Sequence, residues 1–285
     1  MRFPVHLEEN FMEYKVLALD IDGTLTNSEK QITPKTLEAI LEAQERGATV
    51  ALTSGRPARG IEPYMHKLQL DRYEGYVLAF NGGRIIDCKT QETIFEQVIE
   101  PGWVSKLYDV AKENDVHILS YTEDGNTVVT EHPDDVYIQM EYRLNGLPYR
   151  QVDSFKDFVR YPVNKCIMTG EGEHLAKVEP RVKAFVNGEL NVFRSEPFFL
   201  EVMPNKVDKA FALQKLLEVL GYTRENLIAF GDGYNDVSML GFAGLGVAMS
   251  NAQDAAKQAS DFVTCSNNED GVAYALDRFV LETVR

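Results

Sequence analysis

The sequence is poor in cysteine and histidine and has no long apolar run. Its three cysteines lie far apart without a CxxC pair, so neither a disulfide framework nor a cysteine zinc site is expected. The five histidines never cluster, which argues against a histidine-rich zinc site. No apolar run reaches the length of a membrane span, and the first residues lack the apolar stretch of a signal peptide. We therefore expect reduced thiols in a cytoplasmic protein.

Basic residues are also scarce, since 29 Lys and Arg face 44 Asp and Glu and the formal net charge is -15. A general binder of nucleic acid or of anionic membranes needs a basic surface, so neither partner is expected. An acidic protein can still bind an anionic substrate at a locally positive site. It can also use its carboxylates to hold a cation. No feature of the sequence marks an obligate protein partner.

The two ends of the chain share a rhythm of short apolar runs and amphipathic helices. A strand over 15–20, a helix over 34–46 and a strand over 48–52 form a βαβ unit, which requires parallel strands. Thr33 and Pro34 are typical of a helix start. We predict an α/β fold with a doubly wound parallel sheet. The C-terminal part adds predicted strands over 227–230, 245–248 and 262–264 and predicted helices over 207–220, 237–240, 252–260 and 272–279.

The middle of the chain departs from this rhythm. A turn over 123–126 suggests a hairpin, and hairpin strands mixed with helices indicate an α+β insert. We predict a sheet domain, the core, made of residues 1–84 and 200–285, with a smaller α+β domain over 85–199 and a loose leader over 1–12. The insert contains predicted strands over 117–122, 127–130, 165–169 and 191–194 and predicted helices over 103–112, 136–144 and 174–186.

Two acids, Asp20 and Asp22, stand in Asp20-Ile21-Asp22-Gly23-Thr24, where the first predicted strand ends. In a parallel α/β sheet, ligands bind at the carboxyl ends of the strands. A carboxylate in that position can ligate a hard cation or attack phosphorus. The alternative is a loop that carries two solvated acids.

A second acidic motif, Gly231-Asp232-Gly233-Tyr234-Asn235-Asp236, follows the predicted strand over 227–230. Asp232 could ligate a metal ion, and Asn235 and Asp236 are close enough in sequence to support it. The alternative is a turn that caps the next helix. One parallel sheet would bring both acidic motifs to the same edge.

Two further motifs can bind an anion. Thr53-Ser54-Gly55-Arg56 ends another predicted strand, and hydroxyls and backbone N–H groups at such a turn form an anion cradle. Alternatively, Thr53 or Ser54 only caps a helix. Lys209, near the start of the helix over 207–220, could neutralise a phosphate or could be a solvated surface lysine.

In combination, the four motifs resemble the haloacid dehalogenase superfamily of phosphatases, specifically the Cof-type branch with a large α+β (type II) cap. The similarity runs from Tyr14 onward with the motifs in family order. It implies a Rossmann-like core and a cap between the second and third motifs. Arg56 and Asn81-Gly82-Gly83 match recurrent family positions, and we assign no catalytic step to them. The sequence departs from the pattern at Ala210 and Ser250, where glycine is usual.

The resemblance implies an Mg²⁺-dependent hydrolysis of small phosphorylated metabolites through an aspartyl-phosphate. Sugar phosphates are the first expectation, and cofactor phosphates such as pyridoxal phosphate or FMN are open. Asp20 would be the nucleophile, and Asp22 would protonate the leaving oxygen and then activate water. The implied phosphate-binding residues are Thr53, Ser54, Lys209 and Asn235. The implied Mg²⁺ ligands are Asp20, Asp22 through its backbone carbonyl, and Asp232, with Asp236 supporting the metal shell.

Two other functions stay open. A phosphomutase or phosphotransferase would return the phosphoryl group to a sugar. A non-catalytic protein that binds phosphorylated metabolites would tolerate loss of the motif residues, and none is lost. The insert would select the substrate, but the sequence does not show which of its side chains face the site. Its polar and aromatic candidates are His117, Tyr121, Tyr142, Arg143 and Lys165.

Overall fold

The computed structural model describes residues 14–281, so the predicted leader over 1–12 lies outside the described residues. Within them the chain forms two compact units, one made of residues 14–51 and 217–281 and the other of residues 52–216. The division into core and cap at residues 84 and 199 stays a prediction. In the described part of the chain, no helix is long and apolar enough to cross a membrane.

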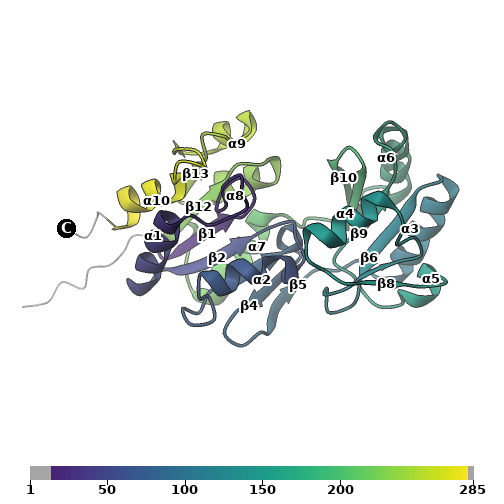
Figure 1. Ribbon diagram of the computed structural model, residues 1–285, viewed down its shortest axis with the longest axis horizontal. Helices are drawn as coiled ribbons and strands as arrows, with labels where there is room; N and C mark the ends of the chain where they lie inside the picture. The colour runs from purple at the N-terminus through teal and green to yellow at the C-terminus, as the bar shows by residue number, and fades with distance from the viewer. Residues whose placement is uncertain (1–13, 282–285) are drawn as a thin grey trace, which may run out of the picture. The chain divides into compact units, whose positions relative to one another are not determined.

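Eight strands share one sheet (Figure 1): β1 (Val16–Asp20), β2 (Thr49–Thr53), β3 (Tyr76–Ala79), β4 (Arg84–Asp87), β5 (Thr93–Glu96), β12 (Leu227–Gly231), β13 (Leu245–Ala248) and β14 (Phe262–Val263). Their order is β14-β13-β12-β1-β2-β3-β4-β5. The pairs β1–β12, β12–β13 and β13–β14 are parallel, as predicted. The pairs β3–β4 and β4–β5 are antiparallel, which the sequence reading missed.

The first unit surrounds its parallel strands with short helices. All five residues of β1 are buried, which is typical of a strand covered on both faces. Helix α1 (Pro34–Glu45) begins where predicted, because the Thr33 side chain accepts the Thr36 N–H at 3.2 Å and proline occupies the first helical position. The unit also contains α8 (Val237–Phe242), α9 (Asp254–Ala259), α10 (Gly271–Leu276), the 3-10 turns η2 (Arg224–Asn226) and η3 (Tyr234–Asp236), and the π-helical η4 (Asp277–Leu281).

The second unit contains a six-stranded sheet made of β6 (His117–Tyr121), β7 (Val128–Thr130), β8 (Tyr149–Gln151), β9 (Cys166–Thr169), β10 (Leu190–Glu196) and β11 (Phe199–Pro204), in the order β10-β11-β9-β6-β7-β8. The predicted hairpin is present as the antiparallel pair β6–β7. Its helices are α2 (Ala58–Lys67), α3 (Pro101–Glu113), α4 (Val136–Leu144), α5 (Phe155–Phe158), α6 (Gly172–Val186) and α7 (Lys209–Leu220), with the 3-10 turn η1 (Phe80–Gly82).

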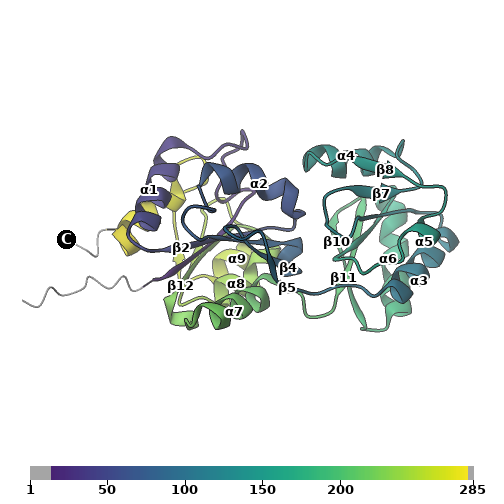
Figure 2. The same cartoon turned by 90° about the horizontal axis from the view of Figure 1, so that it is seen from below.

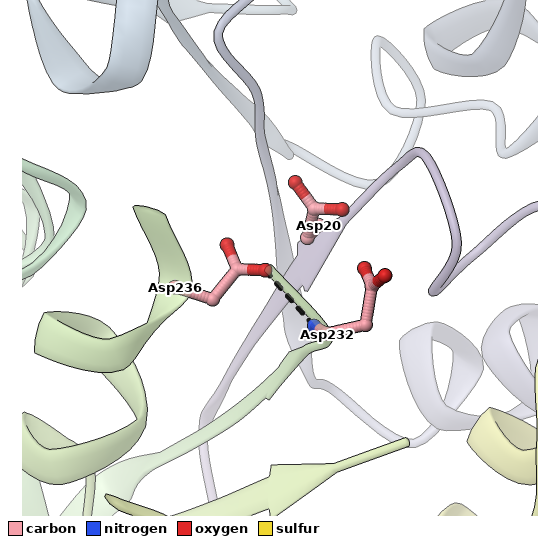
Figure 3. Close-up of side chains that lie close together, drawn as sticks. All are labelled: Asp20, Asp232 and Asp236. Atoms are coloured by element: carbon pink, nitrogen blue, oxygen red, sulfur yellow. Dashed lines mark hydrogen bonds between the residues drawn. The ribbon is translucent and has the colours of Figure 1, made fainter. Parts of the chain in front are cut away.

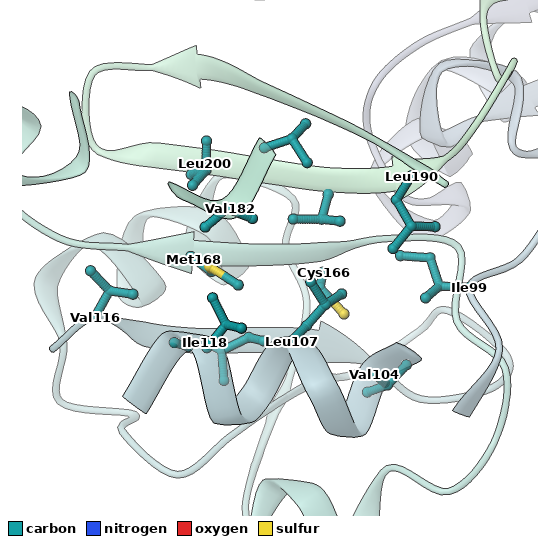
Figure 4. Packing of buried hydrophobic residues seen from close by; sticks show 14 of the residues in the cluster. Ile99, Val104, Leu107, Val116, Ile118, Cys166, Met168, Val182, Leu190 and Leu200 are labelled. Carbon is teal, nitrogen blue, oxygen red and sulfur yellow. The ribbon is translucent and has the colours of Figure 1, made fainter. Parts of the chain in front are cut away.

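Helices and strands of this unit bury a common apolar core. Figure 4 shows Val104 and Leu107 of α3 directed toward Ile118 and Cys166 of the sheet. Helices α3 and α5 lie side by side in both views (Figures 1 and 2). Helix α6 contributes Val182 to the same core (Figure 4). The predicted α/β fold with an α+β portion is confirmed.

Candidate active site

Three carboxylates converge in the first unit. Asp20 is the last residue of β1, Asp232 follows β12, and Asp236 ends η3. One carboxylate oxygen from each residue lies within 4.8 Å of the other two, and Figure 3 shows the three side chains close together. The parallel pairing of β1 with β12 accounts for this, because it aligns the ends of the two strands.

Hydrogen bonds fix the loop that carries Asp232. The Asp236 carboxylate accepts the backbone N–H of Asp232 at 2.9 Å (Figure 3) and that of Gly233 at 2.8 Å. The Thr24 hydroxyl donates to Asp232 at 2.9 Å. Gly23 is required here, because its φ is +84° and a Cβ would lie 2.4 Å from a carboxylate oxygen of Asp232. The loop is therefore built around its carboxylates.

This cluster is suited to a hard cation. Asp20 is 6% exposed and Asp236 is fully buried, so water screens their charges poorly. At a separation near 4.8 Å, two ionised carboxylates repel by roughly 3 kcal/mol in a protein of effective dielectric 20. Mg²⁺ prefers oxygen ligands of this kind. Among residues 14–281 this is the one group of three or more acidic, histidine or cysteine side chains with the spacing of a metal site.

Asp22 and Asn235 are placed differently from the three carboxylates. The Asp22 side chain is 36% exposed and pairs with Lys30, Oδ1 to Nζ, at 2.8 Å. A solvated pair of this kind contributes little to stability, so the Asp22 carboxylate can exchange partners at low cost. Asn235 lies in η3 beside Asp236. The roles that the resemblance implies for these two residues stay predictions.

The second unit holds the predicted phosphate loop, in which Thr53 and Ser54 are buried. The Ser54 N–H donates to the Leu78 carbonyl at 3.0 Å, and the Asn81 N–H donates to the Ser54 carbonyl at 2.8 Å. The Arg56 N–H donates to the Ser54 hydroxyl oxygen at 3.2 Å. Asn81 has a positive φ of 53°, in the left-handed region that asparagine adopts more readily than most non-glycine residues.

Lys209 begins α7 and is fully buried. Its Nζ lies 3.5 Å from the Thr53 carbonyl oxygen, so the structure brings the predicted lysine to the predicted phosphate loop. A buried ammonium is costly unless it is paired, which sets Lys209 apart from the solvated surface lysine that was the alternative.

The candidate residues of the insert separate into two groups. Tyr121 and Lys165 are buried, and the Lys165 ammonium lies 5.9 Å from the centre of the Tyr121 ring. His117 instead pairs with Asp135. Sequence reasoning missed Glu201, which is buried on β11; its one signal is an acid inside the apolar run FLEVMP. The partly or largely exposed candidates Tyr142 and Arg143 lie on α4.

Comparisons with known proteins agree with this arrangement. A model of the haloacid dehalogenase-like hydrolases matches residues 17–276. The 5-amino-6-(5-phospho-D-ribitylamino)uracil phosphatase YcsE of Bacillus subtilis is 31% identical over 270 residues, which cover 95% of this chain and 97% of that protein.

Solved structures show the same fold. A haloacid dehalogenase-like hydrolase from Bacteroides thetaiotaomicron has a TM-score of 0.88 at 45% identity, over 93% of this chain and 99% of that one. The subclass IIB sugar phosphatase BT4131 has a TM-score of 0.76 at 26% identity, over 93% and 98% of the two chains. The chain therefore belongs to the haloacid dehalogenase-like hydrolases, which confirms the family and the enzyme class predicted from its motifs.

Proposed function

We propose that this protein is an Mg²⁺-dependent phosphatase that hydrolyses small phosphorylated metabolites, sugar phosphates first among them, through an aspartyl-phosphate. The observation that carries the proposal is the convergence of Asp20, Asp232 and Asp236 at the ends of two parallel strands. The relatives add support, since one acts on a phosphorylated ribityl compound and another is a sugar phosphatase. The three free thiols fit the proposed cytoplasmic location.

In the proposed reaction the Asp20 carboxylate attacks phosphorus in line, and the bond from phosphorus to the leaving oxygen breaks. Asp22, in its acid form, gives its proton to that oxygen. The Asp22 carboxylate then takes a proton from water, whose oxygen attacks phosphorus and frees the Asp20 carboxylate. Thr53, Ser54, Lys209 and Asn235 bind the phosphoryl oxygens.

The carboxylates fit the implied metal ion. Asp20, Asp232 and the backbone carbonyl of Asp22 would hold Mg²⁺, and Asp236 would support them through its bonds to the Asp232 and Gly233 N–H groups. When bound, the ion neutralises negative charge and orients the reacting groups. Removing it is expected to leave carboxylate repulsion that opposes the approach of an anionic substrate to Asp20.

The test is phosphate release from a panel of sugar, ribityl and cofactor phosphates, with Mg²⁺ and with EDTA, for the wild type and Asp20→Asn. We expect release that requires Mg²⁺ and disappears in the variant. Conversion of one sugar phosphate isomer into another without net phosphate release would instead identify a mutase. Binding of the same compounds without turnover, by folded protein supplied with Mg²⁺, would contradict both enzymes.

A further inference from the structure

Lys165 is a buried cation that contacts the phosphate loop from the inserted segment. It precedes β9, is 3% exposed, and places its Nζ 3.3 Å from the Gly55 carbonyl oxygen. The same Nζ lies 3.4 Å from Glu201 Oε2, and Glu201 is 7% exposed. Burial of an ion pair costs several kcal/mol in desolvation, so simple packing does not explain its presence.

The contact with Gly55 reaches Ser54 through one peptide group. The Gly55 carbonyl and the Arg56 N–H belong to the same peptide plane. That N–H donates to Ser54 Oγ at 3.2 Å. Lys165 therefore donates to the carbonyl oxygen of the same peptide group whose N–H donates to the Ser54 hydroxyl oxygen. A cation on the carbonyl polarises the peptide and strengthens the bond that its N–H donates.

The hydrogen bond from the Arg56 N–H sets the direction in which the Ser54 hydroxyl can donate. Because Ser54 Oγ accepts from Arg56, its own O–H remains available to donate to another acceptor. A phosphoryl oxygen is such an acceptor, and a preoriented donor costs no reorganisation when the substrate binds. A lysine more than a hundred residues away in sequence can thus set the orientation of a phosphate-binding hydroxyl.

Arg84 offers a comparison within the same unit. It is also a buried cation, 8% exposed, and it donates to the carbonyls of Glu123 and Asp124, each at 2.8 Å. Those carbonyls lie in the turn of the β6–β7 hairpin, away in sequence from the phosphate loop. Arg84 also pairs with Glu96, so it is a second buried cation of this unit, and it acts through contacts other than the Gly55 carbonyl.

We propose that Lys165, held by Glu201, is a positioning residue for phosphate binding, which acts on Ser54 through the Gly55–Arg56 peptide. This inference rests on the proposed function, because it assigns Ser54 to the phosphoryl group. It predicts that the effect of Lys165 requires the Ser54 hydroxyl. A lysine that only docks the inserted segment would act independently of that hydroxyl.

The experiment is a double-mutant cycle between Lys165→Met and Ser54→Ala. It measures kcat/KM for p-nitrophenyl phosphate and, by calorimetry, the affinity for inorganic phosphate. We expect Lys165→Met alone to lower both by about tenfold, the effect of one hydrogen bond to a charged group. In the Ser54→Ala background the same substitution should change them by less than about twofold. Full additivity would overturn the proposal.

Control variants separate this effect from loss of the fold. Lys165→Met with Glu201→Leu removes both buried charges and should fold while keeping the tenfold loss. Lys165→Arg retains a donor and should restore part of the lost affinity. Arg84→Gln should lower the stability of the fold. Its effect on phosphate affinity should be additive with that of Ser54→Ala.

The calorimetry also keeps the two proposals apart. Absence of turnover in the wild type would refute the phosphatase, whereas coupled phosphate affinities would still support the link from Lys165 to Ser54. Turnover with uncoupled affinities would refute the link alone.

Discussion

The two compact units bury different charged groups. The first unit buries Asp20 and Asp236 close to each other, with Asp232 beside them. The second unit buries two ammonium groups, Lys209 and Lys165, each near a carbonyl of the phosphate loop. The second unit also buries Glu141 and Glu201, and Glu201 pairs with Lys165, so its buried charges are of both signs, whereas the buried charged side chains described in the first unit are acidic.

This difference indicates what each unit binds. Buried carboxylates at mutual distances below 5 Å favour a cation, because the alternative is repulsion in a poorly screening environment. Buried ammonium groups beside hydroxyl and N–H donors favour an anion. The proposed substrate, a phosphate ester bound with a divalent cation, would meet both preferences.

The largest effect should come from Asp20, the proposed nucleophile in the first unit. Asp20→Asn removes the carboxylate that we propose as the attacking group, and we expect kcat to fall at least about a thousandfold. Phosphate release under saturating substrate measures the loss, and thermal unfolding serves as the control for folding. Turnover within tenfold of the wild type would show that Asp20 is not the nucleophile.

The second unit should show the next largest effect, at Lys209. Lys209→Met keeps the length of the buried side chain and removes its charge, so we expect kcat/KM to fall by about a hundredfold or more. The affinity for inorganic phosphate should fall with it, because both depend on the ammonium. Lys177→Met, at an exposed position of α6, is the matched control and should leave kcat/KM and phosphate affinity unchanged. Equal effects at the two lysines would contradict a site role for Lys209.

Metal binding should affect the first unit through Asp232. A ligand that binds only the folded state stabilises it by about 2.7 kcal/mol at a hundred times its Kd. We expect Mg²⁺ to raise the Tm of the wild type relative to EDTA and to have a much smaller effect on Asp232→Asn. Lys209→Met should respond to Mg²⁺ like the wild type. If Asp232→Asn kept the full response, the carboxylate cluster would not be the metal site.

The residues differ in how far the sequence predicts them. Asp20 and Asp232 are predictable because each follows a short apolar run, and a parallel sheet aligns such strand ends. The pairing of Asp22 with Lys30 depends on side-chain conformation, which leaves no pattern in the sequence. Contacts such as that between Lys165 and Gly55 depend on the tertiary fold of distant segments, and no periodicity encodes them.

The prediction of the fold from the sequence is limited in a similar way. The parallel strands around β1 are short apolar runs, and the buried ones alternate with helices, so their direction follows from the sequence. Strands β4 and β5 are short and only partly buried, and their antiparallel pairing was missed. The sequence marks Glu201 only as an acid inside the apolar run FLEVMP, and it does not show that Glu201 pairs with Lys165.

The smallest effect concerns thiols, which also differ between the units. Cys88 and Cys166 of the second unit are buried, and burial raises the pKa of each thiol to about 12. At pH 8 the thiolate is then about one part in ten thousand, and the thiolate is the reactive form. Cys265 of the first unit is only partly buried.

We therefore expect iodoacetamide at pH 8 to label the native protein once, at Cys265, and to label all three cysteines in guanidinium chloride. Intact mass followed by peptide mapping gives the site. Labelling of Cys166 at the rate of Cys265 would require the core of the second unit to open frequently, because no other route exposes a thiol packed against Ile118 and Leu107. That result would also argue against a rigidly held Lys165, which is the neighbour of Cys166 in sequence. The contact of Lys165 with the phosphate loop would then not be prebuilt, unlike the carboxylate cluster of the first unit.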